Sequence, residues 1–248
     1  MSPQVIAHRG NSSVAPENTL AAIAAAISCG AGSVEIDVQL TRDRVPVVIH
    51  DDHLDRTTSG SGPVAETDAA TLRELDAGSW FSPAFAQQRV PRLDEVLALL
   101  ASSSDVELLL EVKGAWGSDD VRLVTDAIAA SGLGDRVLLQ SFAVATVAAL
   151  ADAAPDLRRG LLVVESGDHV LELCRDLGVV SCNPHGPTLV ERPELIEQAH
   201  AAGMAVMVWT LNDPAQWEAA TDLGVDGIIT DRPDRLLGWQ TAIRRVPA

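Results

Sequence analysis

The sequence predicts a single α/β barrel, because three observations point to the same architecture. Short β-branched or apolar runs alternate with Ala- and Leu-rich stretches of helical spacing, which is typical of β/α units around a parallel sheet. Eight such units follow one another along the chain. The 248 residues, 47% of them hydrophobic, are enough for one sizeable core. We therefore expect one (β/α)8 TIM barrel domain over residues 1–248.

The predicted elements divide the chain into regular units. Glycine follows five of the helices, where its backbone freedom suits a C-terminal cap. The predicted strands lie at 5–8, 33–38, 106–112, 136–141, 158–163, 179–183, 205–210 and 227–231. The predicted helices lie at about 17–29, 92–101, 119–131, 144–152, 168–177, 192–202, 214–223 and 233–244.

An additional apolar run at 46–50 interrupts this alternation. Only residues 41–44 separate it from the second barrel strand, which is too short for a crossover helix, so we expect an antiparallel hairpin with His50 beside Ile36. The next stretch, about 51–91, is rich in Ser, Thr, Gly and Asp and has one helical signal at 70–75. We expect a small insertion or lid here, whose aromatic residues either pack on the barrel or line a substrate path. These aromatics are Trp80, Phe81 and Phe85.

Charge and composition limit the partners that the protein can have. With 35 acidic and 18 basic residues the formal charge is −17, which argues against nucleic acid and anionic membrane surfaces as partners. No apolar stretch is long enough to span a bilayer, and the first strand starts too early for a signal peptide, so we expect a cytoplasmic protein without stable membrane insertion. Cys29, Cys174 and Cys182 are odd in number and lack close spacing, which favours reduced, packed thiols.

Reactive side chains gather where the predicted strands end. Such ends meet at the carboxyl face of an α/β barrel, where the active sites of this fold lie. Glu35 and Asp37 are two apart and therefore point to the same side of one strand. Glu111 and Lys113 share this spacing on the next barrel strand. His8 and Arg9 close the first strand, and His50 closes the hairpin.

Three clustered carboxylates need a counter-charge, because like charges about 4 Å apart repel by roughly 4 kcal/mol at an effective dielectric near 20. Oxygen ligands suit a hard divalent ion such as Ca²⁺ or Mg²⁺. Two histidines from separate elements can then act as general acid and general base on a phosphodiester. Arg9 and Lys113 can supply further positive charge, and Lys113 is the only lysine among 18 basic residues.

An ordered series of motifs runs through nearly the whole chain, and it resembles the glycerophosphodiester phosphodiesterase family. The series starts with a His-Arg-Gly motif and ends with a Thr-Asp-Arg-Pro motif. In full, it consists of residues 8–10, 16–19, 35–38, 41–43, 47–51, 54–60, 75–81, 111–113, 140–142, 209–212 and 227–233. Arg44 departs from the pattern, since similar sequences usually carry glycine there. The motifs therefore do not determine the conformation of the hairpin turn.

The resemblance implies a TIM barrel with a small insertion and an enzyme that hydrolyses glycerophosphodiesters to sn-glycerol 3-phosphate and an alcohol. It implies one divalent cofactor, Ca²⁺ or Mg²⁺ with Mn²⁺ possible, and a small-molecule substrate. The implied catalytic pair is His8 and His50, and the implied metal ligands are Glu35, Asp37 and Glu111. Arg9 and Lys113 would bind phosphate, and Trp209 would form a pocket wall.

Two other functions remain open at this point. A lysophospholipase D acting on lysophospholipids would need a longer apolar channel near Trp80 and the two phenylalanines of the insertion. A barrel that binds phosphodiesters without turnover is disfavoured, because every matched catalytic position is filled. The preferred head group, the ion, the oligomeric state and the choice between direct water attack and a cyclic phosphate are also open.

For some polar residues near strand ends, the sequence allows either a structural role or a role in the site. Glu17 is expected to cap the first helix, although its motif also allows a position near Arg9. His185 either contacts substrate or, as we favour, forms part of a structural turn. For Asn183 and Gln140 we consider a role in orienting ligands, and for His53 an exposed or supporting role.

Overall fold

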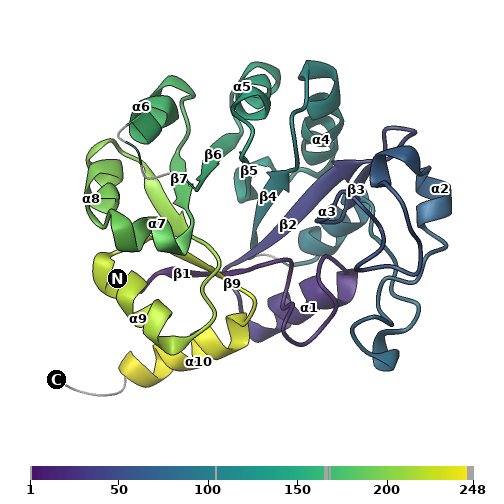
Figure 1. Cartoon of the computed structure of the whole chain (residues 1–248), viewed down its shortest axis with the longest axis horizontal. Helices are drawn as coiled ribbons and strands as arrows, with labels where there is room; N and C mark the ends of the chain where they lie inside the picture. The colour runs from purple at the N-terminus through teal and green to yellow at the C-terminus, as the bar shows by residue number, and fades with distance from the viewer. Residues whose placement is uncertain (1, 104, 165–166, 168, 245–248) are drawn as a thin grey trace.

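The chain forms the predicted barrel in the computed structural model, which describes residues 2–103, 105–164, 167 and 169–244. Parallel strands pair in the order β1-β9-β8-β7-β6-β5-β4-β2, and pairing of β1 with β2 closes the ring (Figure 1). The barrel strands are β1 (Gln4–Ala7), β2 (Ser33–Leu40), β4 (Glu107–Val112), β5 (Val137–Ser141), β6 (Arg158–Val163), β7 (Ser181–Pro184), β8 (Ala205–Val208) and β9 (Gly227–Thr230).

Helices surround this barrel and follow the predicted order. They are α1 (Leu20–Cys29), α3 (Leu93–Ala101), α4 (Ser118–Ser131), α5 (Val144–Ala153), α6 (His169–Asp176), α8 (Glu194–Ala201), α9 (Pro214–Leu223) and α10 (Pro233–Arg244). The helix predicted at 168–177 is described from His169, and Asp168 lies outside the described residues. The short helix α7 (Gly186–Glu191) was not predicted.

The start of α1 differs from the prediction at Glu17. Thr19 is the N-cap, and its hydroxyl accepts a hydrogen bond from Ala22 N at 3.3 Å. Threonine is a strong N-cap residue, whereas a glutamate two residues earlier lies before the helix. The expectation that Glu17 caps α1 is therefore wrong.

Apolar side chains fill both the inside of the barrel and the layer between strands and helices. Two large clusters lie under the surrounding helices, one beneath α1, α3, α4 and α5 and the other beneath α6, α8, α9 and α10. A smaller cluster fills the inside of the barrel, as expected for a packed core rather than a pore. Its buried members are Ile6, Leu109, Leu138 and Ile229, with Met207 and Trp209 packed against them.

The hairpin extends the sheet by one antiparallel strand, β3 (Pro46–Val48). Val38 lies opposite Val48, and Ile49 N donates a hydrogen bond to Asp37 O at 3.0 Å, so the register continues toward His50 beside Ile36 as predicted. Arg44 has a φ of 61°, in the left-handed region that favours glycine. An ion pair of 2.9 Å between its Nη2 and Asp120 Oδ1 anchors the turn to α4.

The insertion after β3 has a small core of its own. It contains η1 (Val64–Glu66), α2 (Ala69–Leu72) and η2 (Pro83–Phe85), so the helix predicted at 70–75 is shorter than expected. Buried side chains of the insertion, among them Leu54, Val64 and Leu72, pack against Val47 and Ile49 of the hairpin. The insertion therefore rests on the hairpin beside the barrel (Figure 1).

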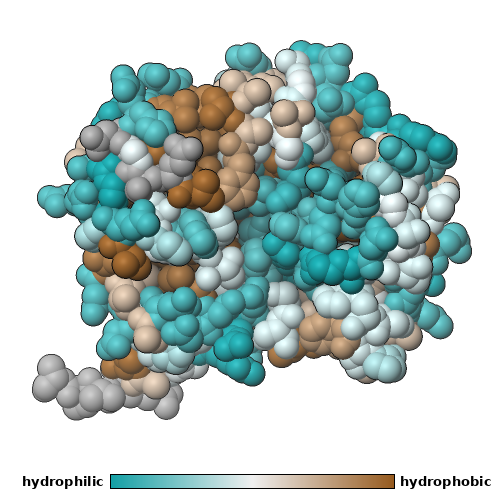
Figure 2. Space-filling model, viewed as in Figure 1, coloured by the Kyte–Doolittle hydropathy of each residue, from teal (hydrophilic) through white to brown (hydrophobic). Residues whose placement is uncertain are grey.

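The surface seen in Figure 2 is mostly hydrophilic, with separate hydrophobic patches on the half of the molecule that contains α6, α7 and α9. Among the described residues, no helix has the length and apolar character that a membrane crossing requires. All three cysteines are free, and Cys174 and Cys182 are buried.

Gly10 allows the chain to turn from β1 toward α1. Its φ is 82°, and a Cβ at this position would lie 2.5 Å from the backbone carbon of Ala22. Both the backbone conformation and the space therefore require glycine.

We expect the substitution Gly10→Ala to lower the free energy of unfolding by about 3 kcal/mol or more, because it combines left-handed strain with a backbone clash. Gly30→Ala is a matched control, since Gly30 has a φ of 88° but open space where a Cβ would lie. It should cost only about 1 kcal/mol. Chemical denaturation of both variants measures the difference, and equal losses would contradict the role assigned to the contact with Ala22.

Candidate active site

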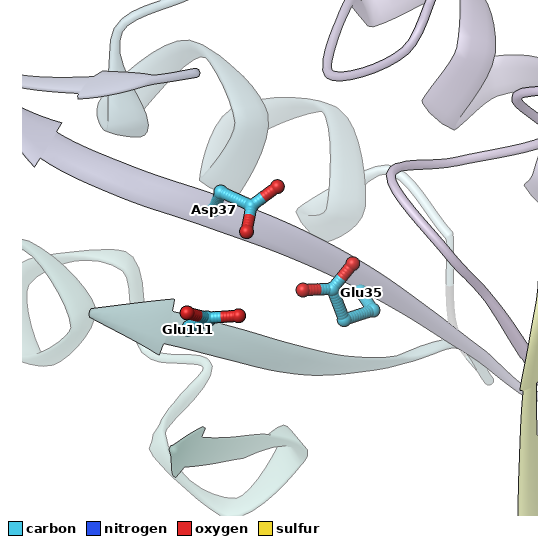
Figure 3. Close-up of side chains that lie close together, drawn as sticks. All are labelled: Glu35, Asp37 and Glu111. Atoms are coloured by element: carbon cyan, nitrogen blue, oxygen red, sulfur yellow. The ribbon is translucent and has the colours of Figure 1, made fainter. Parts of the chain in front are cut away.

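Two neighbouring strands bring three carboxylates together at the carboxyl face of the barrel. Glu35 and Asp37 lie on β2 and Glu111 on β4, and the parallel register places Asp37 directly beside Glu111. One ligand oxygen from each of the three residues lies within 4.8 Å of the others. Figure 3 shows the three side chains on the same side of the two strands. All three are at most 7% exposed, so the cluster is withdrawn from water.

The close approach of the acids shifts their protonation in different directions. Burial and the neighbouring Asp37 carboxylate raise the pKa of Glu111 to about 7. Burial, together with the charges of Asp37 and Glu111, also raises the pKa of Glu35 well above its usual value. Burial acts in the same direction on Asp37, but Arg9 and Lys113 more than offset it and lower the pKa of Asp37. Without a further cation, the cluster is thus strained electrostatically.

Two basic side chains adjoin the acidic cluster. Arg9 contacts it through its backbone N–H, which donates to Glu35 Oε2 at 3.0 Å, and through its guanidinium, whose Nε lies 3.1 Å from Asp37 Oδ2. Lys113 Nζ lies 2.8 Å from Glu111 Oε1 and 3.6 Å from Asp37 Oδ1. Both cations line the cavity next to the acids, where an anionic group can reach them.

The acidic cluster fits a hard divalent ion. Asp37 Oδ2 accepts a hydrogen bond from Asn18 Nδ2 at 2.8 Å, which orients the carboxylate. Its buried Oδ1 accepts no hydrogen bond from any described residue. A buried oxygen without a donor is costly, and a metal ion is one partner that satisfies it. Three carboxylates without a sulfur ligand are the donors that Ca²⁺ or Mg²⁺ prefers, so the cluster can hold such an ion.

Two histidines lie at the cavity, each fixed by a carboxylate. His8 Nδ1 is 2.7 Å from Asp231 Oδ1, and His50 Nδ1 is 2.7 Å from Asp51 Oδ1. A carboxylate acceptor keeps the proton on Nδ1 and leaves Nε2 for proton transfer. Burial lowers the pKa of His50, although the charge of Asp37 acts in the opposite direction.

The carboxylate partners of the histidines are themselves held by hydrogen bonds. Burial raises the pKa of Asp231, but hydrogen bonds from His8, Asn212 and Ser12 bring it to about 2. Hydrogen bonds from Arg56 and from His50 lower the pKa of Asp51 below its usual range. Both acids therefore remain ionised at neutral pH and can stabilise a protonated imidazole beside them.

The cavity that joins these groups has a volume of about 170 Å³. Trp209 and Phe142 form an apolar wall, with their rings edge to face at a centroid distance of 5.3 Å. Trp209 Nε1 donates to Asn183 O at 2.9 Å, which fixes the indole. Of the eight residues predicted for the site, Asp37 lies beneath the lining and the other seven line it: His8, Arg9, Glu35, His50, Glu111, Lys113 and Trp209.

Comparison with known proteins identifies the family. The family model described as "Glycerophosphoryl diester phosphodiesterase family" matches residues 8–235. The chain belongs to the glycerophosphoryl diester phosphodiesterase family. This result confirms the resemblance noted in the motifs and the expectation of an enzyme that hydrolyses glycerophosphodiesters.

Relatives of this family cover almost the whole chain. A glycerophosphodiester phosphodiesterase of Caldanaerobacter subterraneus subsp. tengcongensis is 35% identical, over 96% of this chain and 97% of its own length. The solved structure of an Oleispira antarctica phosphodiesterase in complex with the product sn-glycerol-3-phosphate has a TM-score of 0.92 at 31% identity, with 97% of each chain covered. A glycerophosphodiester phosphodiesterase structure from Agrobacterium tumefaciens has a TM-score of 0.83 at 31% identity, over 95% of this chain and 99% of that one.

Several residues of this phosphodiesterase site were not assigned a role from sequence. Asn18 orients Asp37, while Asp51 and Asp231 hold the histidines. All three lie within the quoted motifs, which was the available signal. Glu17 binds Arg9 Nη1 at 2.8 Å and both terminal nitrogens of Arg56 at 2.8 Å, so it supports the phosphodiesterase site instead of capping α1.

The contacts of four further polar residues near the strand ends can also be described. His185 stacks on Trp209 with a ring centroid distance of 4.6 Å, and its neighbour Gly186 N donates to Trp209 O at 2.7 Å. Asn183 Nδ2 donates to Gln140 Oε1 at 2.7 Å, and both side chains are buried. His53 is 63% exposed in side-chain area. Of these four residues, only Gln140 lines the active-site cavity.

Proposed function

We propose that the protein hydrolyses glycerophosphodiesters to sn-glycerol 3-phosphate and an alcohol in a reaction that depends on one divalent ion. The observation that carries this proposal is the buried group of Glu35, Asp37 and Glu111, within 4.8 Å of one another and next to two histidines. The ion would be Ca²⁺ or Mg²⁺, with Mn²⁺ as a further candidate, and when bound it would neutralise charge on a phosphate oxygen.

The two basic side chains of the cavity would hold the phosphodiester. Arg9 and Lys113 both line the cavity and both also contact acids, so they are positioned before substrate arrives. Fixed cations of this kind stabilise the additional negative charge of a phosphoryl transition state. Trp209 would limit the space on the opposite, apolar side of the cavity.

His8 and His50 would transfer the protons. They come from different elements, after β1 and after β3, and each Nδ1 is bound to a carboxylate. One imidazole would accept a proton from the attacking oxygen, and the other would donate a proton to the leaving alcohol. The attacking oxygen is either water or the adjacent glycerol hydroxyl, and a phosphorus NMR time course distinguishes these routes because a cyclic ester has its own signal.

Water-soluble diesters suit the surroundings of the site better than lysophospholipids. Trp80 and Phe81, where a lysophospholipase D would need an apolar channel, adjoin a cavity whose other lining residues are polar or charged. An acyl chain would gain little from such a surface. Small head groups are therefore the substrates that we propose.

Chelation tests the proposed dependence on a metal. We expect EDTA to lower the rate of glycerol 3-phosphate release from glycerophosphocholine at least about tenfold, because the acidic trio would then repel the substrate phosphate. Added Ca²⁺, Mg²⁺ or Mn²⁺ should restore the rate, and their order identifies the preferred ion. Unchanged release after complete removal of metal would contradict this proposal.

A further inference from the structure

A second cavity of about 510 Å³ adjoins the active-site cavity. His8 and Arg9 line both cavities, so the two spaces meet at a proposed proton-transfer group and a proposed phosphate-binding group. The other lining residues come from the β1–α1 loop, the insertion, the β8–α9 loop, and the loop and helix after β9. Among them are Ser12, Trp80, Phe81, Asn212, Arg232 and Arg235.

The charges in this outer cavity are predominantly positive. Three arginines, at positions 9, 232 and 235, face two carboxylates, Glu17 and Asp231. Both carboxylates are already engaged, Glu17 by Arg9 and Arg56 and Asp231 by His8, Ser12 and Asn212. A local positive excess stands out in a chain with a net charge of −17.

Arg232 and Arg235 supply this excess because neither forms an ion pair within the described part of the chain, whereas Arg9 does. Arg232 Nη1 donates only to a backbone oxygen, Asn212 O, at 3.1 Å. Arg235 is exposed in the first turn of α10. Guanidinium groups bind phosphate and carboxylate oxygens through two parallel N–H donors. Neither of these two guanidinium groups binds an acid of the described chain in this way, so both can bind an anionic ligand.

A phosphodiester has two substituents, and the two cavities offer one space for each. The inner cavity is the smaller one and is bounded by Trp209 and Phe142. The outer cavity is larger than the inner one and can therefore accept substituents of different sizes. Trp80 and Phe81 alone would suit a cationic head group, but Arg232 and Arg235, which form no ion pair with another described residue, favour an anionic group over a cation.

We propose that the outer cavity receives the leaving alcohol and that Arg235, together with Arg232, selects head groups with an additional phosphate. This inference rests on the proposed function, because it assigns the second substituent of the same diester. Arg235 is then a residue that determines specificity.

Paired substrates that differ by one phosphate test this assignment. The ratio of kcat/KM for glycerophosphoinositol 4-phosphate to that for glycerophosphoinositol should exceed about fivefold in the metal-loaded wild-type enzyme and should fall as NaCl is added. Arg235→Gln should reduce the ratio about threefold to tenfold, and Arg235→Lys should retain part of it. Arg235 is preferable to Arg232 for this test, because Arg232 contacts Asn212, which in turn binds Asp231.

Arg122→Gln is the matched control, since it removes the same charge from an exposed position on α4. It should leave the ratio unchanged. A ratio near one in the wild type, or one that Arg235→Gln does not alter, would overturn the head-group assignment while the hydrolytic function stands. If the enzyme hydrolysed none of the three diesters, namely the two inositol esters and glycerophosphocholine, both the head-group assignment and the proposed hydrolytic function would be overturned.

Discussion

Replacing either His8 or His50 by alanine is expected to lower kcat by about 10²-fold to 10⁴-fold, the range for loss of a general acid or base. Each imidazole has a carboxylate on Nδ1 at 2.7 Å and lines the cavity that contains Arg9 and Lys113. Alanine removes the proton-transfer group and leaves the basic side chains, so substrate binding should change much less than turnover. Steady-state kinetics with glycerophosphocholine separate kcat from KM.

His53→Ala is the matched control for these variants. His53 lies three residues after His50, is 63% exposed in its side chain and is absent from the cavity lining. Its loss should leave kcat within about twofold, as expected for an exposed side chain away from the chemistry. Near-normal kcat in both His8→Ala and His50→Ala would refute their assignment as the acid and base.

Glu111→Gln is expected to weaken the proposed binding of a divalent ion at least about tenfold and to lower kcat about 10²-fold or more, because an amide would replace one of the three proposed carboxylate ligands. The substitution preserves the shape of the side chain, so packing around β4 should be maintained. Isothermal titration with Ca²⁺ or Mg²⁺ measures the affinity without reference to activity.

Stability offers a second readout for the same variant. In EDTA, Glu111→Gln should unfold at the same temperature as the wild type or a higher one, because it removes repulsion within the buried trio. Added metal should stabilise the wild type more than the variant, since an ion bound only to the folded state raises stability. A merely structural role for Glu111 predicts the opposite, a loss of stability that is independent of metal.

Glu107→Gln provides the control on the same strand. Glu107 is the first residue of β4, at the opposite end of the barrel, where it binds Gln4 and Arg158. Its substitution should leave metal affinity and kcat near the wild-type values. If both substitutions lowered metal affinity and kcat equally, the cause would be the loss of a charge anywhere on β4. The assignment of Glu111 as a metal ligand would then be refuted.

Most of the fold followed from local patterns in the sequence. Alternating apolar runs and helical spacing predicted every barrel strand and every long surrounding helix, because each unit buries one face locally. The helix α7 was missed, since it spans only residues 186–191 and begins with Gly-Pro, a pair typical of loops. The cap of α1 was misplaced because Glu17 and Thr19 both suit a helix start, and only the contacts of Glu17 with Arg9 and Arg56 distinguish them.

The sequence predicts those parts of the site whose positions follow from the geometry of one strand. It does not predict the parts that depend on contacts between distant segments. Glu35 and Asp37 share a face because strand side chains alternate, and this spacing is visible in the sequence. The pairing of His8 with Asp231 joins residues 223 positions apart, so no local pattern indicates it. The outer cavity likewise combines Trp80 of the insertion with Arg235 of α10, and only the closed barrel brings them together.

Closure of the ring between the first and last strands also makes one catalytic candidate depend on both ends of the barrel. The strand β1 pairs with both β2 and β9, and Asp231, directly after β9, orients His8. A polypeptide that stops before β9 therefore contains Glu35, Asp37 and Glu111 but lacks the carboxylate that orients the imidazole after β1.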